Sequence, residues 1–262
     1  MLIVSGVIRS GTAWVARVCA DMLGAPMVNE PHNPFVGDHG DYGCPPEEFY
    51  ALLVGNRGLF HRFTGHHDTA PDGECAELIE QIMRATKDAF PGFGVAKMMI
   101  MPYWGIALKV WPEARIVYMV RGLASWLSSI VRTSWALPSL AEAEWDGPTT
   151  WRKTGERWAK GDETRRPLYD AAAFRAQTLE THLRTLKSEA PGRYRVFDYD
   201  ELLANYELRV PELADYIGAG PVPDYRAFGY SIPVQRSFKQ APFGWQDVVE
   251  VAAKIQKLHP GR

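Results

Sequence analysis

The sequence predicts an α/β fold in which a central parallel β-sheet is covered by helices on both faces. Short apolar runs typical of buried strands begin at residue 2 and recur along the chain. Longer amphipathic segments typical of helices lie between them, and glycine, proline or polar turn residues separate the two kinds of segment. Strands that alternate with helices in this way form parallel sheets, because each helix returns the chain to the same end of the sheet.

Each predicted element follows from a local pattern. The helix over residues 12–23 carries two rows of apolar side chains that recur every four residues, and Asp72 is the expected N-cap of the helix that begins at residue 74. The predicted strands are residues 2–7, 27–28, 94–101, 115–120 and 194–197. The predicted helices are residues 12–23, 46–54, 74–90, 122–132 and 168–188, one beginning at Asp200, and 247–258.

We expect a single domain over residues 1–262, because neither a linker nor an internal repeat interrupts the pattern. Residues 134–166 differ from the rest of the chain. This segment holds four tryptophans among charged residues, with poor periodicity: Trp135, Trp145, Trp151 and Trp158. We interpret it as a tryptophan-rich insertion in the domain.

Composition excludes several classes of protein. Hydrophobic residues make up 46% and charged residues 23% of the 262 residues, as in ordinary globular proteins. The net charge of −2 gives no field that would attract nucleic acid or an anionic membrane. No apolar run reaches the length of a membrane span, and the first residues resemble a strand rather than a signal peptide. Three cysteines without CxxC spacing make a disulfide framework or a zinc site unexpected. We therefore expect a cytoplasmic protein, and the sequence does not predict its oligomeric state.

The most informative residues lie between the first strand and the first helix, where backbone N–H groups and the helix dipole can hold an anion. Gly6 and Gly11 have the glycine spacing of a Walker A loop, but Thr12 stands where that loop has its lysine. The cation of this loop is Arg9 instead. A guanidinium suits one phosphate held bidentately, whereas a triphosphate needs a lysine and a metal-bound hydroxyl. The alternative interpretation is a plain strand–turn–helix with an exposed arginine.

A second group of candidate residues follows the strand at 115–120. Arg121 leaves the carboxyl end of that strand, where open α/β sheets bind ligands. Ser129 lies eight residues further on, about two helical turns along the next helix. Arg121 and Ser129 could therefore bind a second phosphate well away from the first. For Ser125 and Ser128, we favour a position facing solvent or a neighbouring helix.

These segments resemble the PAPS-dependent sulfotransferases, which use 3′-phosphoadenosine 5′-phosphosulfate as donor, and the bacterial carbohydrate-type branch in particular. Residues 9–14 are similar to the family's 5′-phosphosulfate loop, and residues 112–129 are similar to its 3′-phosphate motif. The likeness also covers Glu30-Pro31, residues 198–202 and Gly244-Trp245.

Two departures concern the phosphate motifs. Ala13 replaces the usual second threonine or serine, and Gly122 replaces the usual aspartate or asparagine after the arginine.

The resemblance implies a P-loop-like three-layer fold and a transferase of the EC 2.8.2 class, with PAPS as donor, PAP as product and no metal requirement. The residues implied for the 5′-phosphosulfate are Arg9, Ser10, Gly11, Thr12, Ala13 and Trp14. Arg121 and Ser129 are implied for the 3′-phosphate. Arg236, in a basic loop with Lys239, is expected to close over the nucleotide. The acceptor is expected to be a hydroxyl of a small molecule or carbohydrate, with residues 134–166 near the acceptor site.

Sulfuryl transfer to a hydroxyl needs a group that removes the acceptor proton. Glu30 is the leading candidate, because it follows the second strand and should emerge at the same sheet edge as Arg9; the resemblance implies the same role. His32 is second, since an imidazole titrates near neutrality. Lys97, in an otherwise apolar strand, could bind the bridging oxygen of the leaving group or orient the acceptor. Alternatively, Glu30 caps a turn or pairs with an arginine, and Lys97 points outward.

Two rival functions stay open. An atypical P-loop kinase or NTP hydrolase would need an acid of the Walker B type and a Mg²⁺ ligand, and neither is evident in the sequence. A nucleotide-binding protein without catalysis is the other rival, and Ala13 and Gly122 give it slight support.

Overall fold

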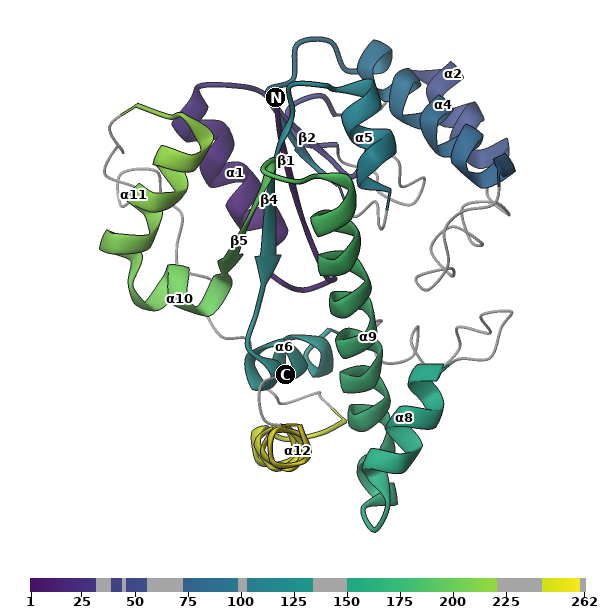
Figure 1. Ribbon diagram of the computed structural model, residues 1–262, viewed down its shortest axis with the longest axis vertical. Helices are drawn as coiled ribbons and strands as arrows, with labels where there is room; N and C mark the ends of the chain where they lie inside the picture. Colours follow the sequence, from purple (N-terminus) through teal and green to yellow (C-terminus); the bar gives the residue numbers. More distant parts are fainter. Residues whose placement is uncertain are drawn as a thin grey trace. The chain divides into compact units, whose positions relative to one another are not determined.

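The computed structural model describes residues 1–31, 39–43, 46–55, 73–98, 103–133, 150–220 and 242–259. Five strands form one sheet in the order β2-β3-β1-β4-β5, and every neighbouring pair is parallel (Figure 1). The strands are β1 (Leu2–Gly6), β2 (Met27–Asn29), β3 (Val95–Lys97), β4 (Arg115–Val120) and β5 (Tyr194–Asp198). The predicted α/β class with a central parallel sheet is confirmed.

Helices connect the strands. Those in the described ranges are α1 (Thr12–Leu23), α2 (Glu47–Gly55), α4 (Gly73–Ala89), α5 (Trp104–Val110), α6 (Leu123–Val131), α8 (Thr150–Ala159), the 3₁₀ turn η1 (Glu163–Arg165), α9 (Arg166–Glu189), α10 (Tyr199–Ala204), α11 (Tyr206–Ile217) and α12 (Trp245–Leu258). None of the helices described is long and apolar enough to cross a membrane.

The chain divides into two compact units. The first unit is Met1–Val120 with Thr181–Tyr230 and contains the whole sheet. The second unit is Arg121–Glu180 with Ser231–Arg262, and all of its described elements are helical. A single sulfotransferase domain over residues 1–262 stays a prediction, as does the place of residues 134–166 near an acceptor.

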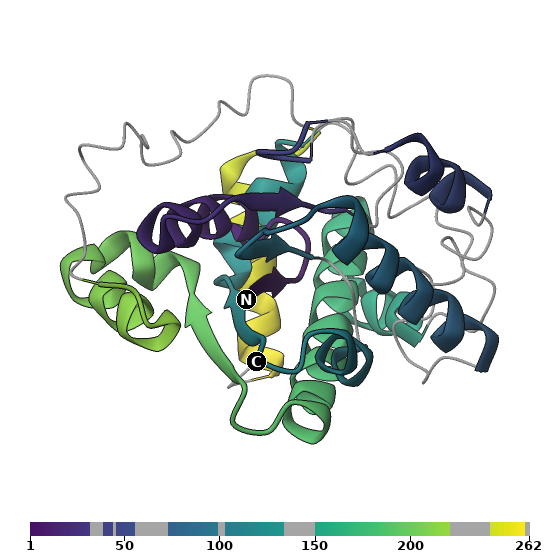
Figure 2. The same ribbon diagram turned by 90° about the horizontal axis from the view of Figure 1, so that it is seen from above.

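Within the first unit, helices cover both faces of the sheet. Alternate strand residues such as Val4, Val117 and Met119 join one core with Val15 and Cys19 of α1 and with apolar residues of α11. The intervening residues face the other side, where the buried Tyr118 packs edge-on against Trp104 of α5. Both views place α1, α10 and α11 on one side of the sheet and α4 and α5 on the other (Figures 1 and 2).

Several elements differ from their predicted form. β3 ends at Lys97 rather than at Met101, although Met98 still donates its N–H to Val4 O, 3.0 Å away, and residues 99–102 lie outside the described part of the chain. α12 begins at Trp245 rather than Asp247, because Asp247 is the residue that accepts the N–H of the N-cap Gly244, at 2.8 Å. The predicted helix from Asp200 is two helices that meet at Asn205, which has non-helical dihedral angles.

Two helices lack a sequence prediction. α5 has only seven residues, too few to reveal a helical period. α8 lies in the tryptophan-rich segment, where Trp151 and Trp158 stand seven residues apart and are both buried on packing against neighbouring helices. That spacing is two helical turns and indicates a helix, but the many charged residues around the two tryptophans weaken the apolar pattern.

In the second unit, α12 packs on α6, and its Val248, Val251 and Ile255 are buried. Polar contacts add to this packing. Arg165 binds Asp247 at 2.8 Å and Glu250 at 2.7 Å, so η1 and α12 are joined by a three-residue ionic cluster.

Candidate active site

The predicted phosphate loop is a tight turn between β1 and the N-terminus of α1. Ser10 donates its N–H to Val7 O at 3.1 Å, and Val15 makes the first helical bond to Gly11 O, also at 3.1 Å. Gly11 is the N-cap of α1 with φ of 84°, and no side chain caps the helix. The first N–H groups of a twelve-residue helix therefore lack a side-chain acceptor at the carboxyl end of β1, an arrangement that favours an anion.

Both glycines of the loop are required by close packing. A Cβ on Gly6 would lie 2.5 Å from the carbonyl oxygen of Met119, in the neighbouring strand β4. A Cβ on Gly11 would lie 2.1 Å from Cδ2 of Tyr199, far inside van der Waals contact. The glycine spacing seen in the sequence thus has a steric cause on both sides of the loop.

Tyr199 covers this loop and was assigned no role by sequence reasoning. Its ring packs edge-on against Trp14, with centroids 6.0 Å apart. Tyr199 is the first residue of α10, whose N-cap Asp198 accepts the N–H groups of Asp200 at 2.8 Å and Glu201 at 3.2 Å. Residues 198–202 therefore form the start of a capped helix that holds an aromatic ring against the predicted phosphate loop.

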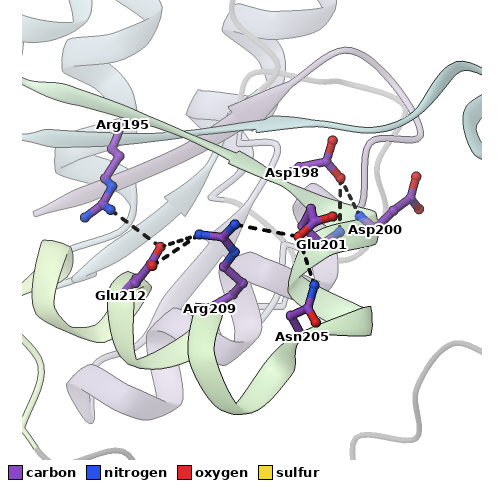
Figure 3. Close-up of polar contacts among 7 residues, drawn as sticks. All are labelled: Arg195, Asp198, Asp200, Glu201, Asn205, Arg209 and Glu212. Atoms are coloured by element: carbon purple, nitrogen blue, oxygen red, sulfur yellow. Dashed lines mark hydrogen bonds and ion pairs between the residues drawn. The ribbon is translucent and has the colours of Figure 1, made fainter.

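A chain of ionic contacts fixes α10 against α11 and β5 (Figure 3). Glu201 is 3.7 Å from Arg209, which in turn contacts Glu212 at 3.2 Å. Glu212 also lies 3.5 Å from Arg195 on β5, and Asn205 donates to Glu201 at 2.9 Å. Exposed ion pairs contribute little individually, but this network links the three elements around Tyr199.

The other side chains of the loop divide by exposure. Ser10 and Thr12 are buried, whereas Arg9 and Ala13 are exposed. Trp14 is half-buried, and its indole Nε1 is enclosed without a hydrogen-bond partner among the described residues. The missing hydroxyl at position 13 therefore lies on the open side of the first helical turn.

Glu30 and Lys97 meet at the ends of two neighbouring strands. Asn29 and Lys97 are register partners of β2 and β3, and Glu30 donates its N–H to Lys97 O at 2.8 Å. The Lys97 ammonium forms an ion pair with Glu30 Oε1, and the side chains are only 11% and 17% exposed, respectively. The alternative in which Lys97 points outward is wrong, because its side chain is buried and its ammonium contacts Glu30.

Arg9 and Glu30 share an unusual backbone conformation. Among the described residues, they are the two non-glycine residues with positive φ, at 64° and 43°. The left-handed region costs an L-residue about 1–2 kcal/mol, and such strain gathers at functional sites. Glu30 directly follows β2 and Arg9 lies in the turn after β1, so both lie at the same carboxyl edge of the sheet. This strain is independent of the sequence pattern that singled out the same two residues.

Residues 39–43 brace the strand that carries Glu30. His39 Nδ1 is 2.9 Å from Asn29 O, and since a carbonyl only accepts, this nitrogen carries the proton. Asp41 accepts Arg17 at 2.7 and 2.9 Å and Met27 N–H at 2.8 Å. Partial burial acts to raise the pKa of Asp41, but the hydrogen bonds from Met27 and Arg17 outweigh it and hold that pKa below its usual value. Sequence reasoning missed His39 and Asp41, because their partners are backbone atoms or distant in the chain.

In the second unit, Arg121 is tied to the first turn of α6. Its Nε donates to Ser125 Oγ at 2.7 Å, so Ser125 has a specific partner instead of facing solvent. Ser128 and Ser129 are both buried on the same helix. Arg175 of α9 donates to the carbonyl oxygen of Arg121.

Two predicted site residues, His32 and Arg236, lie outside the described residues, as do Lys239, Trp135 and Trp145. Within the described ranges, no three His, Cys, Asp or Glu side chains form a metal-binding group.

Comparison with known proteins finds matches among solved structures alone: no protein-family model matches the sequence, and no curated protein does. A sulfotransferase of Mycobacterium avium matches with a TM-score of 0.50 and 14% identity, covering 98% of this chain and 76% of that one. The sulfotransferase domain from the curacin biosynthetic pathway has a TM-score of 0.48 and 13% identity, covering 98% and 97%. A sulfotransferase of Mycobacterium tuberculosis has a TM-score of 0.45 and 16% identity, covering 96% and 76%. At such identities the likeness concerns the fold, and this chain has the fold of the sulfotransferases.

Proposed function

We propose that the protein is a sulfotransferase that moves the sulfuryl group of PAPS to a hydroxyl of a small-molecule or carbohydrate acceptor. The observation that carries the proposal is the pairing of Glu30 with Lys97 at the same sheet edge as the arginine-containing loop, with Glu30 and Arg9 both held at positive φ. A carboxylate next to an anion-binding turn is what transfer to a hydroxyl requires.

The 5′-phosphosulfate is proposed to bind at residues 9–14. The amide N–H groups at the start of α1 and the Arg9 guanidinium would hold its oxygens, as the uncapped helix N-terminus supports. Arg121 and Ser129 are proposed for the 3′-phosphate, and Arg236 for closure over the nucleotide. The acceptor is proposed to lie near residues 134–166. The three nucleotide assignments rest mainly on the sequence resemblance, and the acceptor assignment rests on the tryptophans of that segment.

In the proposed reaction, the acceptor oxygen attacks sulfur in line with the leaving phosphate oxygen. The new O–S bond forms as the S–O bond to the 5′-phosphate breaks, and Glu30 takes the hydroxyl proton. The charge that develops on the departing phosphate of PAP is stabilised by Arg9 and by backbone N–H groups. The proposed step uses no metal, because the guanidinium and the backbone N–H groups would stabilise this charge.

Lys97 is proposed to hold Glu30 ionised and aimed, since its ammonium contacts that carboxylate. A role at the bridging oxygen of the leaving group, or in orienting the acceptor, would require this ion pair to open. The contact therefore favours a positioning role for Lys97, and His32 stays the second candidate for the base.

A thermal-shift panel of PAP, ATP and GTP, each with and without Mg²⁺, tests the proposal. A ligand at one hundred times its Kd stabilises the folded state by about 2.7 kcal/mol, which is a shift of several degrees for a chain of this size. We expect stabilisation by PAP in the absence of Mg²⁺. Stabilisation by ATP or GTP alone, and only with Mg²⁺, would instead favour the kinase or NTP hydrolase.

A further inference from the structure

We propose that Ser125 and Arg175 are positioning residues that fix Arg121 for the 3′-phosphate of the nucleotide. The inference rests on the proposed function, because it concerns how one residue of that binding site is held. All the residues that carry it belong to the second unit.

The side chain of Arg121 is held from α6. Its Nε donates to Ser125 Oγ at 2.7 Å, across the first turn of the helix. Neighbours of Ser125 on α6, Trp126 and Leu127, are fully buried, so the hydroxyl stands on a fixed helical turn. Guanidinium groups bind phosphate through a fork of parallel N–H donors, and one such fork is formed by the two terminal nitrogens. A contact through Nε orients the plane that contains that fork.

The backbone of Arg121 is held from α9. Arg175 Nη2 donates to the carbonyl oxygen of Arg121, and the Arg175 Cζ lies 5.9 Å from the centroid of the buried Trp126 ring. A planar guanidinium near an enclosed aromatic face, with one nitrogen on a carbonyl, has little rotational freedom. Arg175 also adds a second cation at this turn, which raises the positive potential around Arg121.

Gly122 explains why such support is needed. It is the N-cap of α6 and has no side chain to accept the first helical N–H groups, so no side-chain cap fixes the junction of Arg121 with the helix. Ser125 and Arg175 supply restraints on each side of this glycine. Arg121 is therefore still held in place although Gly122 replaces the aspartate or asparagine that is usual in the family.

Isothermal titration of PAP and AMP tests the proposal, because the two ligands differ only in the 3′-phosphate. We expect Ser125→Ala and Arg175→Met each to lower the affinity for PAP by about tenfold while the affinity for AMP stays unchanged, since a charge-assisted contact is weakened. Ser125→Thr keeps the hydroxyl and should restore the parent ratio. Ser128→Ala removes the hydroxyl of another buried serine on the same helix; it is the matched control and should behave like the parent.

The outcomes distinguish the positioning role of Ser125 and Arg175 from the proposed use of PAPS. Parent protein that binds PAP and AMP equally would overturn both, because no 3′-phosphate site would exist. A parent preference for PAP that survives in Ser125→Ala and Arg175→Met would overturn the positioning role and leave the proposed donor intact. Ser125→Ala decides the matter even where Arg175→Met fails to fold, since it removes a single oxygen from a half-buried position.

Discussion

Arg9 and Glu30 are the residues in which backbone strain coincides with a proposed chemical role. Glu30 directly follows β2, and Arg9 lies in the turn after β1. Each has a positive φ, a backbone conformation that costs an L-residue conformational energy. Substitutions at these positions can separate the free-energy cost of the backbone conformation from the contribution of the side chain to binding or catalysis.

Replacing Arg9 by glycine or by alanine distinguishes strain from binding. Arg9→Gly relieves the positive φ but adds unfolded-state entropy, so the free energy of unfolding should change by less than about 1 kcal/mol. Both variants lose the guanidinium and should weaken PAP binding by about 1.5–3 kcal/mol, the value of a hydrogen bond to a charged group. Titration calorimetry and urea unfolding measure the two effects. Unchanged PAP affinity in both variants would show that this loop does not hold the donor.

Glu30→Gln tests the base, because it keeps the size of the side chain but cannot accept a proton. Turnover should fall by about 10²–10⁴-fold, while PAP binding should hardly change. His32→Asn should lower turnover less, with PAP release as the measure of turnover in both variants. A large loss only in His32→Asn would transfer the role to that residue, and near-normal turnover in both would make Lys97 the residue to test as the base.

Lys97→Met tests the positioning of Glu30. Without the ammonium, the carboxylate is protonated more easily, so the acid limb of the pH–rate profile should move to higher pH. PAP affinity should stay unchanged. A loss of PAP affinity with an unmoved acid limb would instead place Lys97 on the leaving group.

At the scale of elements, α10 matters because its first residue, Tyr199, packs against the loop between β1 and α1. Gly11→Ala should lower the free energy of unfolding by about 2–4 kcal/mol, since the new Cβ meets the Tyr199 ring and φ is 84°. Gly24→Ala is the matched control: it has φ of 57° with nothing within 4 Å, and should cost only about 1 kcal/mol. Equal losses, measured by urea unfolding, would mean that Tyr199 does not enclose the loop.

The anchoring of α12 gives a pH-dependent prediction. The hydrogen bond from Gly244 N–H, together with Arg165, lowers the pKa of Asp247 below its ordinary value of 3.8, against a smaller effect of burial. A carboxyl with a depressed folded-state pKa adds stability above its unfolded value and loses it as the pH falls through the folded value. The stability difference between the parent and Asp247→Asn should therefore be constant from about pH 5 to 7 and shrink below about pH 4. A difference independent of pH down to about pH 3 would contradict this assignment.

Hydrophobic periodicity and turn residues predict most helices and strands, but not all of the contacts between them. The first helix, from Thr12 to Leu23, matches the structure because two apolar rows and the following Gly24 define it locally. The contact of Tyr199 with Gly11 joins residues 188 positions apart, and no local pattern encodes it. Similarly, the sequence shows Lys97 as a charge in an apolar strand, but its partner depends on the register of β2 against β3.

At the scale of the whole molecule, the sheet order explains why the candidate residues gather at one edge. Residues after β1, β2 and β3 come from distant parts of the sequence, but parallel pairing brings these strand ends together. The sheet and the likeness to solved sulfotransferases establish the fold, while the chemistry is a property of the residues at that edge. The proposed place of residues 134–166 near the acceptor rests on a segment with a weaker pattern.

The central claim is sulfuryl transfer from PAPS to a hydroxyl, and mass spectrometry of the reaction products tests it most directly. The parent protein is incubated with PAPS and pools of small-molecule and carbohydrate alcohols, with EDTA present. We predict a sulfated product and PAP in equal amounts, and a large drop of both with Glu30→Gln although that variant still binds PAP. Binding of PAP without any transfer, or phosphate transfer that needs ATP and Mg²⁺, would contradict it.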